Sequence, residues 1–141
     1  MNNKMKLIFS SKSENESFAR NVISCFALSL NPTLAELSEI KTSVSEAVTN
    51  AIVHAYSHGV GEITMEAEII DNTLHINVFD KGKGIENVSN ALEPFYTTNA
   101  EDERSGMGFT IMQSFMDKVV VESNIGYGTK VYMTKKLKQD A

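Results

Sequence analysis

A long apolar stripe dominates the first half of the chain. Between Thr33 and Gly59, apolar residues recur every three or four positions, which is the repeat of a helix with one buried face. They are Leu37, Ile40, Val44, Ala47, Val48, Ala51 and Ala55. Thr33 and Glu36 have the spacing of a capping box, in which two side chains satisfy backbone groups at a helix start. The pattern predicts a long helix that begins after Thr33 and ends before Gly59.

A shorter helix is predicted before this one. Ser13 and Glu16 repeat the capping-box spacing, and Asn31-Pro32 ends the segment because proline cannot continue a helix. The apolar residues at helical spacing are Phe18, Val22, Cys25, Phe26 and Leu30. This stripe predicts the face that packs on the core, with Cys25 inside it. A strand over residues 5–9 precedes the helix.

The apolar repeat shortens to two residues after Gly61. Two alternating segments on either side of Asp71-Asn72 predict a hairpin of two strands. Their apolar positions are Ile63, Met65, Ala67, Ile69, Leu74, Ile76 and Val78. Further along, the pattern predicts a helix over residues 109–116, strands over 119–121 and 129–134, and a turn over 124–128 between them.

Residues 85–105 show little periodicity. Structureless connections longer than about 12 to 15 residues are typically lids, binding loops or disordered segments, so a lid is predicted here. The order of elements predicts an α+β fold, a two-layer α/β sandwich with helices on one face of a mixed, mostly antiparallel sheet. A chain of 141 residues fits one such domain, and we expect residues 1–141 to form it.

Charge and cysteine content exclude several classes of protein. Acidic residues outnumber basic ones 18 to 13, and no basic strip could follow a nucleic-acid backbone, so direct DNA or RNA binding is not expected. No segment approaches the run of about 18 apolar residues that crosses a bilayer. A single cysteine cannot form an intramolecular disulfide, which agrees with a reducing compartment. We expect a cytoplasmic protein that does not bind membranes.

The predicted long helix carries the first candidate site residues. Glu46 and Asn50 are four positions apart, so they project from nearly the same side, well round from the centre of the apolar stripe. An amide oxygen suits Mg²⁺, and a carboxylate can orient or deprotonate a hydroxyl. Most pairs of this kind are solvated helix surface, so the pair alone identifies no site.

A second candidate follows the predicted hairpin, at Asp80-Lys81-Gly82-Lys83-Gly84. A carboxylate at a strand end can accept a hydrogen bond from the adenine amine, whereas guanine presents an acceptor oxygen there. Gly82 and Gly84 permit a tight turn against a base or sugar. On its own, the pentapeptide is more typical of an ordinary turn after a strand.

The third candidate is the start of the predicted third helix, at Ser105-Gly106-Met107-Gly108. Backbone N–H groups and the helix dipole favour an anion at a helix start, and glycines let phosphate oxygens come close. A capped helix end without a ligand is the competing interpretation.

Together the three segments resemble a known family. Residues 46–50, Asp80 to Gly84, Gly106 to Gly108 and the closing Gly128-Thr129 are similar, in order, to the nucleotide-binding boxes of the GHKL (Bergerat) ATPases, which include gyrase, histidine kinases and MutL. Ser45 to Ala51 and Glu103 to Phe109 resemble the anti-sigma factor serine kinase branch in particular.

The resemblance implies a nucleotide site for ATP and Mg²⁺. It assigns Glu46 as catalytic base, Asn50 as Mg²⁺ ligand and Asp80 as adenine partner. The other nucleotide-binding positions that it implies are Gly82, Gly84, Thr97, Thr98, Arg104, Ser105, Gly106, Met107, Gly108 and Thr129. For Arg104, a solvated arginine is nearly as good an interpretation as a lid residue at the γ-phosphate.

The resemblance also implies a function. It predicts a protein serine/threonine kinase that binds and inhibits a sporulation sigma factor and phosphorylates a serine of an anti-anti-sigma protein, and it predicts a homodimer. Arg20 is a candidate contact for an acidic partner helix. The alternatives are a nucleotide-gated sigma-binding module without kinase turnover and a plain GHKL ATPase.

Overall fold

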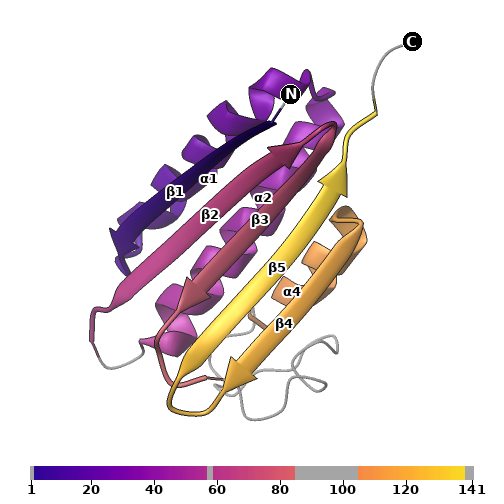
Figure 1. Ribbon diagram of the computed structural model, residues 1–141. Helices are drawn as coiled ribbons and strands as arrows, with labels where there is room; N and C mark the ends of the chain where they lie inside the picture. Colours follow the sequence, from indigo (N-terminus) through magenta and orange to yellow (C-terminus); the bar gives the residue numbers. More distant parts are fainter. Residues whose placement is uncertain (1, 57–58, 85–104, 139–141) are drawn as a thin grey trace.

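The computed structural model describes residues 2–56, 59–84 and 105–138, in which a five-stranded sheet carries helices on one face (Figure 1). The strands are β1 (Asn2–Ser10), β2 (Glu62–Ile70), β3 (Thr73–Asp80), β4 (Lys118–Asn124) and β5 (Gly128–Lys136). Their order across the sheet is β1-β2-β3-β5-β4, and each of the four described pairings is antiparallel. The predicted fold class is confirmed.

The helices form the second layer, behind the sheet in Figure 1. They are α1 (Glu14–Ala27), α2 (Leu34–Asn50) and α4 (Ser105–Phe115), with a 3₁₀ turn η1 (Leu28–Leu30) after α1 and a π-helical turn η2 (Ala51–Ala55) after α2. Helix α2 packs against both α1 and α4. Its apolar stripe meets the inward-facing residues of the strands, so the core lies between the two layers.

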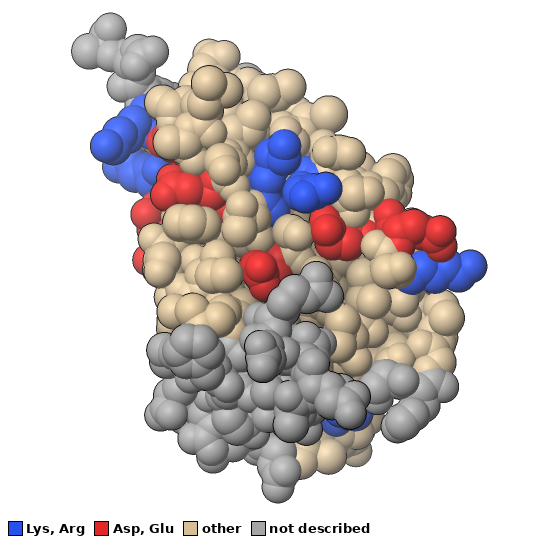
Figure 2. Space-filling view, turned by 180° about the vertical axis from the view of Figure 1, so that it is seen from behind, with Lys and Arg blue, Asp and Glu red and all other residues tan. Residues whose placement is uncertain are grey.

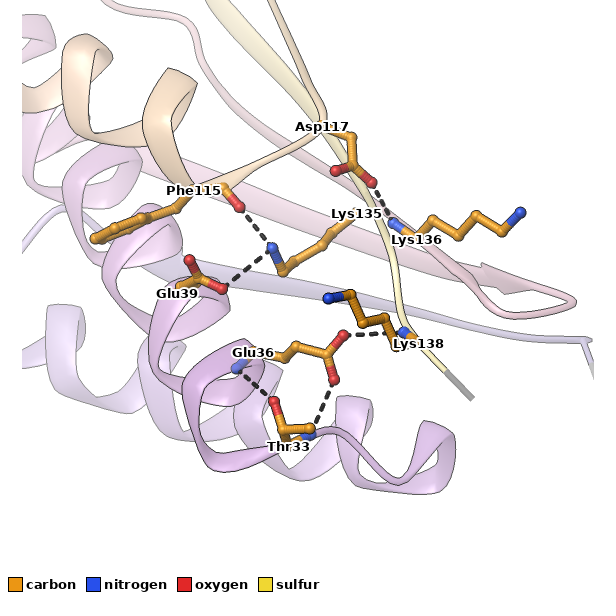
Figure 3. A network of polar contacts seen from close by, with 8 residues as sticks. All are labelled: Thr33, Glu36, Glu39, Phe115, Asp117, Lys135, Lys136 and Lys138. Carbon is orange, nitrogen blue, oxygen red and sulfur yellow. Dashed lines mark hydrogen bonds and ion pairs between the residues drawn. The ribbon is translucent and has the colours of Figure 1, made fainter. Parts of the chain in front are cut away.

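The predicted capping box at the start of α2 is confirmed. The Thr33 side-chain oxygen accepts a hydrogen bond from the Glu36 N–H at 3.0 Å, and Glu36 Oε1 accepts one from the Thr33 N–H at 2.9 Å. Glu36 Oε2 accepts a third bond, from the Lys138 N–H at 2.9 Å (Figure 3). Burial raises the pKa of Glu36, but these bonds and the positive charge of Lys135 outweigh it, so the pKa lies below its usual value.

The predicted capping box at Ser13 is wrong. Ser13 has helical backbone angles (φ −57°, ψ −33°) and its side chain caps nothing, whereas a capping residue needs an extended backbone. Asn15 instead donates a side-chain hydrogen bond to the Ser10 carbonyl oxygen at 2.8 Å. Glu16, the expected partner of Ser13, forms an ion pair with Arg20.

The predicted core face of α1 is only partly correct: Val22 and Phe26 pack partly buried against the core and Leu30 is buried, but Phe18 and Cys25 lie outside it. The helix buries Ala19, Ile23 and Ala27, while Phe18 is 49% exposed and Cys25 is exposed. The small alanine side chains let α1 approach its neighbours closely. The bulkier stripe therefore lies on the adjoining, partly exposed side of the helix.

Charged side chains of both signs occur on the helix side of the molecule (Figure 2). Figure 2 views the molecule from the helix side, where basic and acidic groups are interspersed rather than gathered into a basic strip. Within the described part of the chain, no helix is long and apolar enough to cross a membrane.

Candidate functional site

The side chains of Glu46 and Asn50 face the first turn of α4. A Cβ atom added to Gly108 would lie 3.1 Å from Asn50 Nδ2 and 3.2 Å from Glu46 Oε2. Contacts this short are tighter than nine in ten real Cβ contacts, so a side chain at position 108 would require both groups to shift by a few tenths of an ångström. The absence of a side chain at Gly108 thus lets a carboxylate and an amide approach the start of α4.

Asn50 combines burial with an unsatisfied polar atom. It is the last residue of α2, just before the π-helical turn η2. Its Nδ2 is buried and has no hydrogen-bond partner among the described residues. Buried polar atoms are nearly always paired, so an unpaired one points to a ligand or ion that completes the site. Rotation of the amide would present its oxygen instead, which is a ligand type that Mg²⁺ accepts.

The start of α4 supplies donors for an anion. The first four N–H groups of an α-helix have no partner within the helix, and in α4 they belong to Ser105, Gly106, Met107 and Gly108. The helix dipole adds a partial positive charge at the same end. The side-chain surroundings of Ser105 and Gly106 lie outside the described part of the structure.

Asp80 ends β3 as a buried carboxylate, only 9% exposed. Its Oδ1 accepts a hydrogen bond from the Gly82 N–H at 2.8 Å. Burial raises the pKa of Asp80, and hydrogen bonds from the backbone N–H groups of Gly82 and Thr129 offset part of that rise. The hydrogen bonds therefore hold the carboxylate in a defined orientation, while its burial costs hydration free energy.

Thr129 lies directly across from Asp80 in the pairing of β3 with β5. Its hydroxyl is 2.8 Å from the hydroxyl of Ser123 on β4, so a small polar cluster lies beside the carboxylate. Gly128 has φ +116°, and a Cβ atom there would overlap the Asp80 carbonyl oxygen. Only glycine accepts this backbone angle and this close approach.

The turn after Asp80 is held from both sides. A Cβ atom on Gly82 would overlap the carbonyl oxygen of Ala55 in η2, and the Lys83 N–H donates to that same oxygen at 3.1 Å. The Lys83 carbonyl oxygen accepts from the Gly126 N–H at 2.9 Å, and Gly84 has φ +81°. The predicted tight turn is present, fixed between the end of the α2 segment and the β4–β5 turn.

Comparison with known proteins shows the family to which this chain belongs. The histidine kinase-like ATPase domain matches residues 9–135. An anti-sigma F factor from Caldanaerobacter subterraneus subsp. tengcongensis is 58% identical over 134 residues, covering 95% of this chain and 94% of that one. Another, from Clostridium acetobutylicum, is 55% identical over 136 residues, covering 96% and 95%. The chain belongs to the anti-sigma F factors of the histidine kinase-like ATPase family.

Solved structures carry the same ATPase-family fold. The RsbU and RsbW domains of Rv1364c from Mycobacterium tuberculosis match 99% of this chain with a TM-score of 0.73 at 17% identity. Full-length ShkA in complex with AMPPNP matches 91% with a TM-score of 0.57 at 17% identity. This chain spans 34% and 30% of those two chains, so the likeness concerns the fold alone.

The structure places the described residues of the predicted site in two groups. Glu46, Asn50 and Gly108 meet between α2 and α4, whereas Asp80 and Thr129 meet between β3 and β5. Met107 is half-buried in the first turn of α4. Thr97, Thr98 and Arg104, together with nearly all of the predicted lid, lie outside the described residues.

Sequence reasoning missed Tyr56, which supports the ATPase-family site from outside. Its hydroxyl accepts a hydrogen bond from the Lys81 N–H at 2.7 Å and donates one to the Glu62 carbonyl oxygen at 2.8 Å. Its ring lies against Gly61, where any side chain would overlap it. Tyr56 thus joins the end of the α2 segment to the residue that follows Asp80. An aromatic residue five positions before a glycine gave no signal of this role.

Replacing Tyr56 with phenylalanine is expected to lower the free energy of unfolding by about 1 to 2 kcal/mol, because the Lys81 N–H and the Glu62 carbonyl both lose their partner. Urea denaturation followed by circular dichroism measures the change. The matched control is Tyr127→Phe, since Tyr127 is 82% exposed and its variant should match the wild type. Equal stability of all three proteins would show that the Tyr56 hydroxyl has no supporting role.

Proposed function

We propose that this chain binds Mg-ATP between α2, α4 and the place where β3 ends beside the start of β5, and transfers the γ-phosphoryl group to a serine of an anti-anti-sigma protein. It also binds a sporulation sigma factor and inhibits it. The observation that carries the nucleotide site is the close approach of Glu46 and Asn50 to Gly108. A carboxylate and an amide at a helix start form a set of groups suited to a polyphosphate and its cation.

Glu46 acts as the general base in this proposal. The serine oxygen forms a bond to the γ-phosphorus while the bond from that phosphorus to the bridging oxygen of ADP breaks. The serine proton passes to the Glu46 carboxylate, and ADP leaves. The N–H groups of α4 hold the negative charge on the phosphate oxygens, so the chain catalyses mainly by positioning and electrostatics.

Asn50 holds the cation by its amide oxygen. Among the described residues no cluster of three or more His, Cys, Asp or Glu side chains could bind a metal unaided. A magnesium ion here would therefore be held by phosphate oxygens as well as by the protein, as is usual for nucleotide sites. Bound Mg²⁺ supplies neutralisation of phosphate charge. The buried, unpartnered amide nitrogen of Asn50 fits a side chain that gains its partner on binding.

Asp80 selects adenine. Its carboxylate already accepts backbone hydrogen bonds from Gly82 and Thr129, which leaves lone pairs for the exocyclic amine of the base. The proposal places the base near Thr129 and the phosphates near Gly108. A lid over residues 85–105 and nucleotide contacts by Thr97, Thr98 and Arg104 belong to the same proposal, and all of these residues except Ser105 lie outside the described part of the chain. Residues 1–141 act as a single domain in the cytoplasm.

The partner assignments follow from the relatives named anti-sigma F factors, which match nearly the whole chain. Arg20 is a contact for an acidic partner helix: its side chain is 39% exposed on α1, and its ion pair with Glu16, at 3.5 Å, is partly exposed.

A homodimer is part of the same proposal. Strand β1 is an edge strand whose outer backbone groups have no neighbouring strand in the described sheet. Ile8 on β1, Phe18 on α1 and Leu28 in η1 are each about half exposed. An unpaired edge beside apolar side chains suits association with a second copy of the chain.

Two measurements with one protein preparation test the proposal. Calorimetry with Mg-ATP and Mg-GTP is expected to give binding of ATP only, and γ-labelled ATP is expected to label the anti-anti-sigma partner on serine. Binding without labelling would instead favour a nucleotide-gated sigma-binding module. Label released as phosphate without a partner would favour a plain ATPase, and no uptake of ATP would refute the nucleotide site.

A further inference from the structure

Lys135 is a buried lysine at the end of the α2–α4 contact that lies away from Glu46 and Asn50. The residue is only 8% exposed, in β5. Its ammonium group donates a hydrogen bond to the Phe115 carbonyl oxygen at 2.6 Å and lies 3.4 Å from Glu39 Oε1 (Figure 3). Phe115 is the last residue of α4, and Glu39 belongs to α2. One positive charge therefore joins the C-terminus of α4 to α2 and to the sheet.

The position of Glu39 connects this anchor to the nucleotide site. Glu46 and Asn50 follow Glu39 by about two and about three helical turns, so all three lie on the side of α2 that faces α4. On α4, Phe115 follows Gly108 by about two turns. The helices thus meet at two polar points, one at Gly108 and one at Lys135.

Helix α4 depends on external anchors. Gly106 and Gly108 are poor helix formers, and with 11 residues the helix is shorter than those that are stable alone. A cation at a helix C-terminus satisfies a carbonyl group and opposes the negative end of the dipole. Burying an ammonium group is costly unless its partners are well placed, as the carbonyl oxygen and the Glu39 carboxylate are here.

We propose that Lys135 is a positioning residue for the phosphates of the nucleotide: it fixes α4 lengthwise against α2, so that the start of α4 stays at Glu46 and Asn50. This inference rests on the proposed nucleotide site. It separates two parts of that site, because the adenine partner Asp80 pairs with Thr129 at one end of the β3–β5 ladder, whereas Lys135 pairs with Leu74 near the other end. Lys135 then governs affinity for the outer phosphates without governing affinity for the base.

The test compares ATP with AMP in the full-length chain. Lys135→Met keeps an apolar stem of similar length and removes the charge. The dissociation constant of Mg-ATP is expected to rise about fivefold to twentyfold, from the loss of a partly buried helix-terminus charge. AMP, which lacks the outer phosphates, is expected to bind as in the wild type. Lys136→Met is the matched control, because Lys136 is exposed and only its backbone N–H contacts Asp117.

Equal loss of ATP and AMP affinity in Lys135→Met would overturn the proposal, since it would indicate a role in the whole fold, and so would unchanged ATP affinity. If Lys135→Met fails to fold, Glu39→Gln carries the test, with an ATP-selective loss of about twofold to threefold expected because the Glu39 side chain is 34% exposed. Hydrogen exchange without ligand must show faster exchange in α4 than in α1. The hydrogen-exchange measurement tests the role of Lys135 even if the wild-type protein binds no nucleotide. Absence of nucleotide binding by the wild type would refute the proposed function separately.

Discussion

Replacing Glu46 with glutamine is expected to slow phosphoryl transfer to the partner serine about 100-fold to 10,000-fold, which is the range for loss of a general base. Glutamine keeps the size of the side chain and can still lie against Gly108, but it cannot take the serine proton. ATP affinity should stay within about threefold of wild type, because the proposal assigns binding to Asn50, α4 and Asp80.

The measurement is a time course of γ-labelled phosphate on the partner at saturating Mg-ATP, with binding followed separately by calorimetry. Glu68→Gln is the matched control, since Glu68 is exposed on the sheet and pairs across from Lys4, away from the helices. Transfer at the wild-type rate by Glu46→Gln would remove the base assignment. Loss of ATP binding along with transfer would instead make Glu46 a binding residue.

Helix α2 was predictable because every local signal in it agrees. The capping box at Thr33, the apolar stripe and the spacing of Glu46 and Asn50 all belong to one helix, and local patterns can therefore fix them. Strands β2 and β3 were predictable for a similar reason, since one buried face produces an alternation of apolar and polar residues that is regular in β3 and nearly so in β2. The structure extends the predicted first strand from residues 5–9 to Asn2–Ser10 without changing its face.

Helix α1 was harder because it has two apolar sides. The sequence favours the stripe with the larger residues, such as Phe18, whereas the fold fully buries the one with Ala19 and Ala27 and leaves Phe26 partly buried at its border. The choice depends on how closely α1 packs against its neighbours, and single-sequence periodicity contains no such distance. The exposed position of Cys25 follows from the same choice.

The anchor at Lys135 and the support from Tyr56 could not be predicted from the sequence. Lys135 is close in sequence to Lys136 and Lys138, and such a group of lysines is typical of a solvated surface segment. Its two partners come from α2 and α4, which are remote in sequence. The Tyr56 hydroxyl likewise bonds to backbone atoms. Every residue has these backbone groups, so the residue types in the sequence do not indicate such a bond. Such contacts depend on the tertiary arrangement alone.

Asp80→Asn is expected to weaken Mg-ATP binding about 10-fold to 100-fold, the effect of losing a charge-assisted hydrogen bond in a buried site. The preference for ATP over GTP should fall as well. The carboxylate accepts from the adenine amine, whereas the asparagine amide can donate to the guanine oxygen. Competition of the two nucleotides for the wild type and the variant measures both effects.

Asp80→Asn should weaken ATP binding without lowering the stability of the fold, and this difference makes it the most informative variant. Because burial raises the pKa of Asp80, the folded chain retains this proton at pH values where the unfolded chain has lost it. Asp80 therefore destabilises the fold increasingly as pH rises through its folded-state pKa, and Asp80→Asn removes that dependence while its oxygen still accepts from the Gly82 N–H. The variant should melt at or above the wild-type temperature at neutral pH, and ATP binding by the wild type should weaken as pH falls through the same range.

Asp71→Asn is the control, since Asp71 is exposed at φ 55°, an angle that asparagine also accepts. A less stable Asp80→Asn that binds ATP normally would show that this carboxylate serves the fold and not the nucleotide.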